Sequence, residues 1–190
     1  MAQKLILPIN KTRVTAGYKN PNYKKEFGYN HYGSDLTDQN KSDKTVWGSG
    51  NGVVTHVGWS NSCGNVICAV YKNCLLTNGQ VKDLTIRYYH LEKINVKAGD
   101  KITKDTRLGL YGSTGASTGD HLHIEVDTDT KYPNYTPQLG KNSGVLKAGT
   151  DSTINPTTAL YVKTTSPDNQ SVKNSGYNTV ASSDLSYQKY

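Results

Sequence analysis

Residues 112–126 read Gly-Ser-Thr-Gly-Ala-Ser-Thr-Gly-Asp-His-Leu-His-Ile-Glu-Val, a glycine-rich turn followed by an alternating segment. Residues i and i+2 of a β-strand point to the same face, so His121 and His123 are expected to project together. Two imidazoles side by side on a buried strand need a metal ion, a carboxylate or another hydrogen-bonding partner. Glu125 continues this face and could support a metal-ligating histidine from behind. For the His-x-His pattern alone, a solvent-exposed strand face is the alternative.

The sequence on either side favours short β-strands joined by tight turns. Asn78-Gly79 is a turn signal between two apolar runs and predicts a hairpin. No stretch between residues 45 and 126 has sustained helical periodicity. The expected strands cover residues 52–58, 65–72, 81–91, 107–111 and 121–126. We therefore predict a mainly β chain with an antiparallel β-sandwich or open barrel-like core.

Longer polar segments interrupt this pattern. Residues 37–44 predict a polar surface loop, and residues 127–153 predict a long irregular excursion. Asn155-Pro156 begins a short return that ends near residue 162. The residues after 163 are rich in Ser, Thr and Asn and contain few aliphatic side chains, which is typical of a disordered tail. We predict one domain over residues 1–162, with long loops, and a polar C-terminal extension over residues 163–190.

The composition argues against several classes of protein. The 190 residues carry a net charge of +7, with 22 Lys and Arg against 15 Asp and Glu. No apolar run approaches the roughly 20 residues of a membrane span, so no span is expected. Lys24-Lys25 is the only adjacent basic pair, which favours a solvated basic surface over specific nucleic-acid binding. A polyanion binder is supported by the net charge alone.

The cysteines and the first residues bear on the compartment. Cys63, Cys68 and Cys74 lack the Cys-x-x-Cys spacing of a structural zinc site, so buried reduced thiols are expected, with one disulfide as the alternative. Residues 1–8 show no secretory signal, because their apolar run is short and no small-residue cleavage site follows. An intracellular protein, release without a signal, a virion component and a trimmed chain are all compatible with this start.

Other histidines extend the candidate site. His31 and Asp35 stand four residues apart, and Gly33 between them disfavours a helix. A bent, extended segment could bring both to one metal ion, although an unrelated surface pair is the more common arrangement. A catalytic zinc takes three protein ligands and keeps one position open, and His31, Asp35 and one histidine of the His-x-His pair supply that number. His90 and the other member of the pair could hold or deprotonate water and stabilise an oxyanion. His56 is given no role.

Taken in order, these motifs resemble those of the lysostaphin/LytM-type zinc endopeptidases, which cut bacterial cell-wall peptides. The family pattern H-x(3)-D occurs at residues 31–35, Tyr-x-His-Leu at 88–91, and Gly-x-Thr-Gly-x-Ser-Thr-Gly-x-His-x-His-x-Glu at 112–125. The resemblance covers roughly residues 5–162. It implies a peptidase core of the duplicated hybrid motif type and one Zn²⁺ ion held by His31, Asp35 and His123. It also implies that His90 and His121 are the catalytic histidines.

The resemblance implies a zinc-dependent endopeptidase that hydrolyses peptide crosslinks or stem peptides of bacterial peptidoglycan. The missing secretory signal suggests a phage lysin or tail-tip enzyme, virion-associated or released extracellularly to act on the wall. The C-terminal extension would then contact other virion or tail proteins. The alternative is a non-catalytic virion structural or cell-wall-binding module with the same fold. Tyr29, Tyr32, Tyr88 and Tyr111 lie near the motifs and either line a cleft or pack in the β core.

Overall fold

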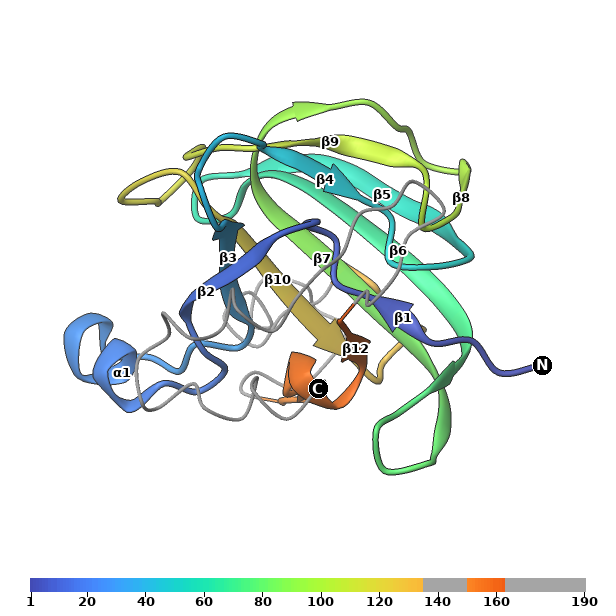
Figure 1. The fold of residues 1–190 in the computed structure, drawn as a ribbon. Coiled ribbons are helices and arrows are strands. Elements are labelled where there is room, and N and C mark those ends of the chain that lie inside the picture. Colours follow the sequence, from blue (N-terminus) through green and yellow to red (C-terminus); the bar gives the residue numbers. More distant parts are fainter. Residues whose placement is uncertain (135–149, 163–190) are drawn as a thin grey trace.

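The computed structural model describes residues 1–134 and 150–162, and this part of the chain is mainly β (Figure 1). Ten strands form one antiparallel sheet: β2 (Thr12–Ala16), β3 (Ser34–Asp38), β4 (Thr45–Trp47), β5 (Gly52–Ser60), β6 (Gly64–Leu75), β7 (Val81–Ile94), β8 (Lys101–Ile102), β9 (Arg107–Tyr111), β10 (Leu122–Asp127) and β11 (Thr153–Ile154). Their order is β2-β3-β10-β7-β6-β5-β8, with β11 paired to β10 and β9 joining β7 to β4. The predicted mainly β, antiparallel fold is confirmed.

The strands expected from the sequence are present, and several are longer than predicted. The two central runs form the β6–β7 hairpin, whose turn contains Gly79 with a φ of +85°. Positive φ is a conformation that glycine adopts without strain. Strands β2, β3 and β4 were not expected from the pattern. Because β9 pairs with both β7 and β4, the sheet folds back over itself and does not lie flat (Figure 1).

The core is formed by buried aliphatic and tyrosine side chains, with a large share from β6, β7 and β10. Tyr88 is fully buried, and its hydroxyl contacts the Tyr71 hydroxyl (2.8 Å) and Ser49 Oγ (3.0 Å). Tyr111 is also buried. The sequence left two alternatives for Tyr88 and Tyr111, lining a cleft or packing in the core. The structure supports packing in the core for both. The three cysteines are free and buried, as predicted.

The predicted surface loop at residues 37–44 is wrong at its N-terminal end. Thr37 and Asp38 are the last residues of β3, and both are buried. The Asp38 backbone N–H donates to the Tyr111 hydroxyl (3.0 Å), and the Asp38 carboxylate accepts from the Ser42 backbone N–H (3.0 Å). These hydrogen bonds satisfy a polar residue that ends a buried strand and begins the turn after it.

Two of the other predictions fall mainly outside the described residues. Residues 135–149 contain most of the predicted irregular excursion, and residues 163–190 are the predicted C-terminal extension. The domain boundary at residue 162 stays a prediction. Within the described part of 127–153, Asp127 ends β10 and Thr153 begins β11, which returns to pair with β10.

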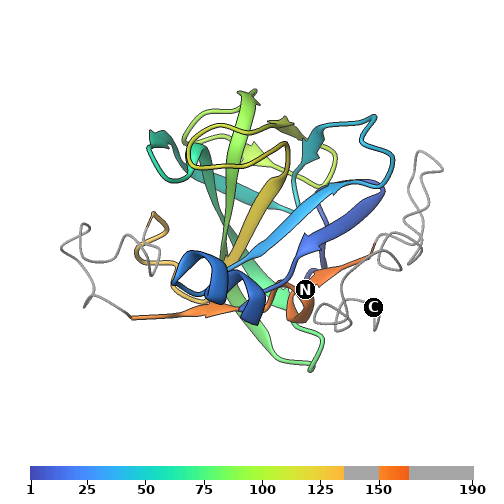
Figure 2. The ribbon, with the colours of Figure 1, turned by 90° about the vertical axis from the view of Figure 1, so that its left-hand side faces the viewer.

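The first and last described strands lie side by side. β1 (Leu5–Ile6) pairs in parallel with β12 (Leu160–Tyr161). Before β12, the Asn155 side chain accepts from Thr157 N (3.1 Å) and caps the short 3₁₀ helix η1 (Pro156–Thr158). This is the short return predicted from Asn155-Pro156. The one α-helix of the described residues, α1 (Pro21–Phe27), lies outside the sheet (Figure 2).

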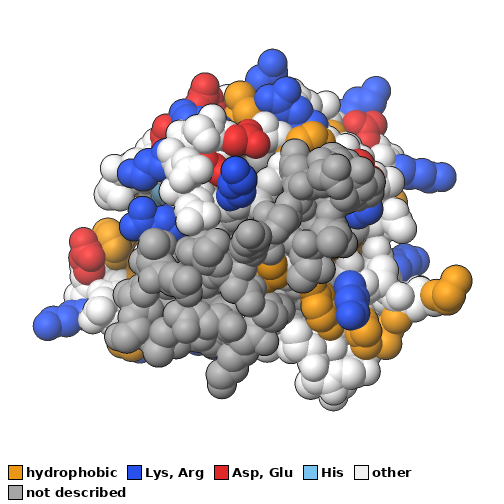
Figure 3. Space-filling model, viewed as in Figure 1, with side chains coloured by type: hydrophobic (Ala, Val, Ile, Leu, Met, Phe, Trp, Pro, Cys, Tyr) orange, Lys and Arg blue, Asp and Glu red, His pale blue; other side chains and the backbone are white. Residues whose placement is uncertain are grey.

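The distribution of Lys and Arg over the surface agrees with the dispersed positive charge that the sequence predicts. On the face shown in Figure 3, the visible Lys and Arg side chains are spread around the molecule and do not gather in one patch. Within residues 1–134 and 150–162, no helix has the length and apolar character that crossing a membrane requires.

Candidate metal centre

Three buried side chains, from two adjacent strands and the loop before one of them, converge on a single point. Asp35 on β3 pairs in register with His123 on β10, and His31 precedes β3. His31 Nε2 lies 2.9 Å from His123 Nδ1 and 3.1 Å from Asp35 Oδ1, and His123 Nδ1 lies 2.9 Å from the same oxygen. The structure thus places together the three residues expected to bind the metal, and Asp35 lies on a strand and not on a helix, which Gly33 disfavoured.

A glycine lets the two strands of the site approach this closely. A Cβ built on Gly33 would lie 2.8 Å from His123 Nε2 and closer still to the Ile124 carbonyl oxygen. Such distances are shorter than ordinary van der Waals contact. Gly33 is therefore needed for space at this point, between the two ligands of the H-x(3)-D motif.

The hydrogen-bond pattern of the cluster suits a cation. His31 Nδ1 faces the Gly17 carbonyl oxygen at 2.7 Å. Because a carbonyl only accepts, Nδ1 donates, and Nε2 offers a lone pair to the cluster. Atoms at about 2.0–2.1 Å from a tetrahedral zinc stand roughly 3.3 Å from one another, which is close to the three separations observed. Two imidazole nitrogens and a carboxylate oxygen are ligands that zinc accepts, so these residues fit the metal.

The local electrostatics point the same way. Burial alone would raise the pKa of Asp35, but His31 and His123 hold it well below its usual value. Burial alone would lower the pKa of His123, but the carboxylates of Asp35 and Glu125 raise it to about 10. The groups around His123 therefore stabilise a positive charge at this point. A metal cation bound there would take the place of a proton.

Behind His123 lies a buried ionic cluster. Glu125 Oε1 is 3.4 Å from His123 Nε2, and Glu125 Oε2 accepts from Arg87 Nη1 at 3.1 Å. The predicted support of a histidine by Glu125 is thus present, and the exposed-face alternative is wrong for His123, because all of β10 is buried. The strand begins one residue later than predicted: His121 forms an isolated bridge with Gly112 just before β10 and is half-buried. Arg87 was missed by sequence reasoning. Its signal is a charged residue within the apolar run of residues 84–91, where a buried charge needs a partner.

The two remaining site histidines lie beside the cluster. The His90 and His121 rings are 4.8 Å apart, and His121 Nε2 lies 3.5 Å from Asp35 Oδ1. His90 Nδ1 donates to the Thr114 carbonyl (2.8 Å), and His121 Nδ1 donates to the Gly119 carbonyl (2.8 Å). In a neutral imidazole, each Nε2 is then left as an acceptor. Burial lowers the pKa of His90 to about 4, so this ring is neutral at physiological pH.

The backbone at His90 is unusual. Its φ is +61°, a left-handed value that is uncommon for residues other than glycine. The His90 N–H donates to the Cys63 carbonyl (2.8 Å), and the His90 carbonyl accepts from Gly112 N (2.9 Å). These bonds hold a conformation that costs about 1–3 kcal/mol. The His90 side chain therefore departs from the regular alternation of side chains between the two faces of β7.

Asp35, His123 and the two remaining histidines, His90 and His121, line a cleft with a volume of about 850 Å³. Its lining includes Tyr23, Phe27 and Tyr29 from α1 and the loop after it, and residues 116–121. Tyr29 is thus a cleft residue, as one alternative predicted, whereas Tyr32 is not among the lining residues. Tyr23, which the sequence did not single out, stacks on His31 with ring centroids 4.3 Å apart.

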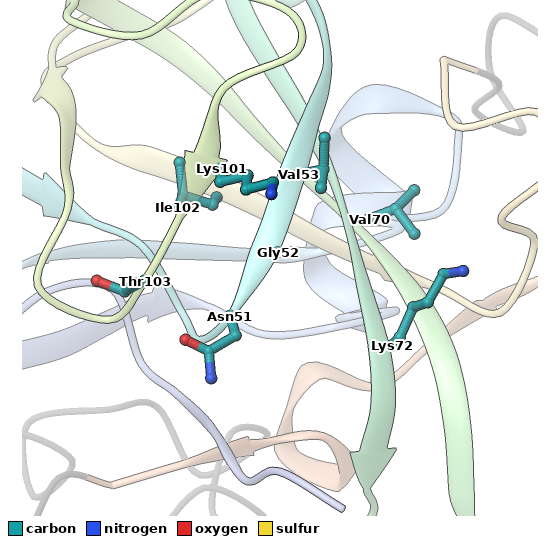
Figure 4. Close-up of a pocket in the computed structure, with 8 residues that line it drawn as sticks. All are labelled: Asn51, Gly52, Val53, Val70, Lys72, Lys101, Ile102 and Thr103. Atoms are coloured by element: carbon teal, nitrogen blue, oxygen red, sulfur yellow. The ribbon is translucent and has the colours of Figure 1, made fainter.

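A second, smaller hollow of about 480 Å³ lies on β5, β6 and β8 (Figure 4). It is mostly apolar, with Val53, Val70 and Ile102, and it carries the side chains of Lys72 and Lys101. None of its lining residues is a histidine, cysteine or carboxylate. It therefore lacks the groups that hold a metal or transfer a proton near neutral pH.

The sequence is similar to those of known peptidases, which agrees with a metal site of this kind. Residues 29–135 match the sequence profile of Peptidase family M23. Lysostaphin from Staphylococcus staphylolyticus is 33% identical over 150 residues, which cover 72% of this chain and 29% of that protein. Peptidoglycan DD-endopeptidase ShyA from Vibrio cholerae serotype O1 is 40% identical over 81 residues, covering 43% of this chain and 17% of that protein. The chain thus matches less than a third of the length of either relative.

A solved structure shares the fold. The crystal structure of a zinc-containing peptidase from Vibrio cholerae has a TM-score of 0.51 and 28% identity, covering 66% of this chain and 37% of that chain. The family profile spans more than half of this chain and includes all three residues of the metal cluster. The chain therefore belongs to peptidase family M23, a family of zinc metallopeptidases, and His31, Asp35 and His123 are its candidate zinc site.

Proposed function

We propose that this chain is a zinc-dependent endopeptidase that hydrolyses peptide crosslinks or stem peptides of bacterial peptidoglycan. The observation that carries the proposal is the convergence of His31, Asp35 and His123 at a cleft whose lining includes Asp35 and His123 together with His90 and His121. The substrate class is supported by the name of ShyA, a peptidoglycan DD-endopeptidase similar to this chain.

The site residues divide the chemistry between them. Zinc, held by His31, Asp35 and His123, would polarise the scissile carbonyl and make hydroxide available near neutral pH. His90 and His121 would orient the attacking water, because each Nε2 accepts a hydrogen bond while Nδ1 is held by a backbone carbonyl. A histidine that takes the proton can then donate it to the leaving amine or to the oxyanion.

The cleft walls would position the peptide. Phe27 and Tyr29 are 43% and 44% exposed, so they offer apolar surface within reach of water. The lining also includes residues 116–121, whose side chains are mostly small. An extended peptide with small side chains, such as glycine or alanine, would fit against such walls. Glycyl-glycine bridges and direct D-alanyl links both meet this description.

Mass spectrometry of purified peptidoglycan tests the proposal. The zinc-loaded protein is incubated with walls of several crosslink types and compared with His121→Ala and with His56→Ala, a matched control on β5 outside the cleft. Wild type and His56→Ala should release new amino termini, and His121→Ala should be slower by about a hundredfold or more. Cleavage of no wall type by the zinc-loaded wild type would overturn catalysis and leave the non-catalytic wall-binding module.

The place of action follows from the substrate. A peptidoglycan endopeptidase acts at the wall, outside the cytoplasmic membrane. Association with a virion, and docking of residues 163–190 to other virion or tail proteins, stay predictions from the sequence. Co-purification of the chain with intact phage particles would test them.

A further inference from the structure

The strongest unassigned feature is the ionic cluster beneath the metal centre, formed by Arg87, Glu125 and Asp127. All three residues are 0% exposed. Arg87 Nη1 donates to Glu125 Oε2 (3.1 Å), Nη2 donates to Asp127 Oδ2 (2.7 Å), and Nε donates to the Pro133 carbonyl (2.8 Å). The guanidinium is therefore held on three sides.

Strand register places this cluster under the site. β7 and β10 are neighbours inside the sheet, and Glu125 pairs with Arg87 while His123 pairs with Tyr89. The Tyr89 hydroxyl also donates to Glu125 Oε2 (3.2 Å). Both donors use the same carboxylate oxygen. The other oxygen, Oε1, is left facing His123 Nε2 at 3.4 Å and has no hydrogen bond from the described residues.

A fixed carboxylate behind an imidazole determines which ring nitrogen faces the metal. A metal-ligating histidine commonly donates its other N–H to a carboxylate, which fixes the ring orientation and the tautomer. If His123 Nε2 donates to Glu125 Oε1, Nδ1 presents its lone pair to His31 and Asp35. In this orientation Nδ1 lies 2.9 Å from both His31 Nε2 and Asp35 Oδ1, the two other atoms that would bind the metal.

The charge count favours a role beyond packing. Two carboxylates face one guanidinium, all three are fully buried, and burying charged groups carries a large desolvation cost. Among the described residues, Glu125 Oε1 faces His123 Nε2 and receives no hydrogen bond from any other group, so this buried oxygen is compensated only through the imidazole.

We propose that Arg87 and Glu125 are positioning residues for the metal centre: Arg87 holds Glu125, and Glu125 holds His123 in the orientation that binds zinc. The inference rests on the proposed zinc-dependent function, but it concerns metal affinity and not wall cleavage.

Zinc affinity, measured by competition with a chromogenic chelator, and the visible absorption spectrum of the cobalt-substituted protein test this role. We expect Glu125→Gln and Arg87→Lys each to weaken zinc binding by about 10- to 100-fold and to change the cobalt spectrum. The double variant should be no weaker than the weaker single variant, because Arg87 acts through Glu125. Tyr89→Phe, which removes one of the two donors to Oε2, is the variant to use if Arg87→Lys does not fold, and it should weaken binding several-fold.

Asp127→Asn is the matched control. Asp127 accepts from Arg87 Nη2, whereas Glu125 accepts from Nη1 and faces His123, so this variant should lower the thermal stability of the metal-free protein and leave zinc affinity within about threefold of wild type. Wild-type zinc affinity and cobalt spectra in Glu125→Gln would overturn the proposal. Equal loss of affinity in Asp127→Asn and Arg87→Lys would also overturn it, since the cluster would then act only as structure. A wild type that binds zinc but cleaves no wall would refute the proposed function alone.

Discussion

Replacing Gly33 with alanine should disturb the metal centre from within the backbone. The added Cβ would lie 2.8 Å from His123 Nε2 and closer still to the Ile124 carbonyl oxygen. Carbon and nitrogen atoms pack at about 3.5 Å, so the ring must retreat by about 0.7 Å, or β3 and β10 must separate. Overpacking of this kind costs about 1–3 kcal/mol. For a chain of this size, that corresponds to a fall of roughly 3–10 °C in the melting temperature.

The same displacement should weaken metal binding. His123 and Asp35 are paired across β3 and β10, so any separation of these strands lengthens a ligand–ligand distance that is now 2.9 Å. We expect zinc affinity to fall by about tenfold or more. Calorimetry of the metal-free protein and a zinc competition titration measure the two effects separately.

Gly119→Ala is the matched control, because it changes the same residue type within the cleft lining. A Cβ at Gly119 meets nothing within 4 Å. The change should therefore shift stability by no more than about 0.5 kcal/mol and leave zinc affinity unchanged. If Gly33→Ala behaved like Gly119→Ala in both measurements, the argument from close approach would be refuted.

Three further perturbations have defined outcomes. Removing zinc with a chelator should abolish peptidase activity and lower the melting temperature, by the equivalent of about 2.7 kcal/mol relative to a zinc concentration a hundred times Kd; an unchanged melting curve would contradict a bound metal. In the folded, metal-free protein, the pKa of His90 is about 4, below its ordinary value of 6.5. As the pH falls below 6.5, the unfolded chain therefore binds a proton at His90 that the folded protein does not bind. Stability should thus rise with pH between about 4 and 6.5, by at most about 3 kcal/mol from this group, and His90→Gln should flatten that slope in urea titrations at pH 5 and 7. Tyr88→Phe should cost about 1–3 kcal/mol in urea denaturation, because the buried Ser49 and Tyr71 hydroxyls each lose a hydrogen bond. Wall cleavage should be unchanged, and a loss of cleavage would indicate that Tyr88 contacts the substrate.

Local features of the sequence were sufficient to predict much of the sheet. The hairpin of β6 and β7 follows from two apolar runs and an Asn-Gly turn, which are signals only a few residues long. The two-residue period of a strand predicts that His121 and His123 project together, and both approach Asp35, although β10 itself begins at Leu122. The convergence of His31 with His123 is different, because these residues are 92 positions apart. The ligand count of a catalytic zinc suggested grouping His31 with one histidine of the pair, and the choice of His123 came only from the resemblance.

Register between strands explains most of what was missed. Arg87 meets Glu125 because β7 and β10 pair at that position, and no spacing within either segment states which residues will be opposite. The alternation of β7 sends Tyr88 into the core and Tyr89 beneath the site. At His90, the left-handed backbone then breaks the alternation. The burial of Asp38 was not predicted for a similar reason, because it depends on the Tyr111 hydroxyl, which is distant in sequence.

The parallel pairing of β1 with β12 has a consequence for how the domain folds. Leu5 leaves the ribosome long before Leu160, its partner across the two strands. Bringing such distant segments together carries a loop-closure entropy cost, and topologies rich in distant pairings fold slowly, in milliseconds to seconds. During synthesis, β1 must wait until nearly all of residues 1–162 have emerged. Slow amide exchange at both strands would therefore mark the completed domain and distinguish it from a chain whose central sheet has formed alone.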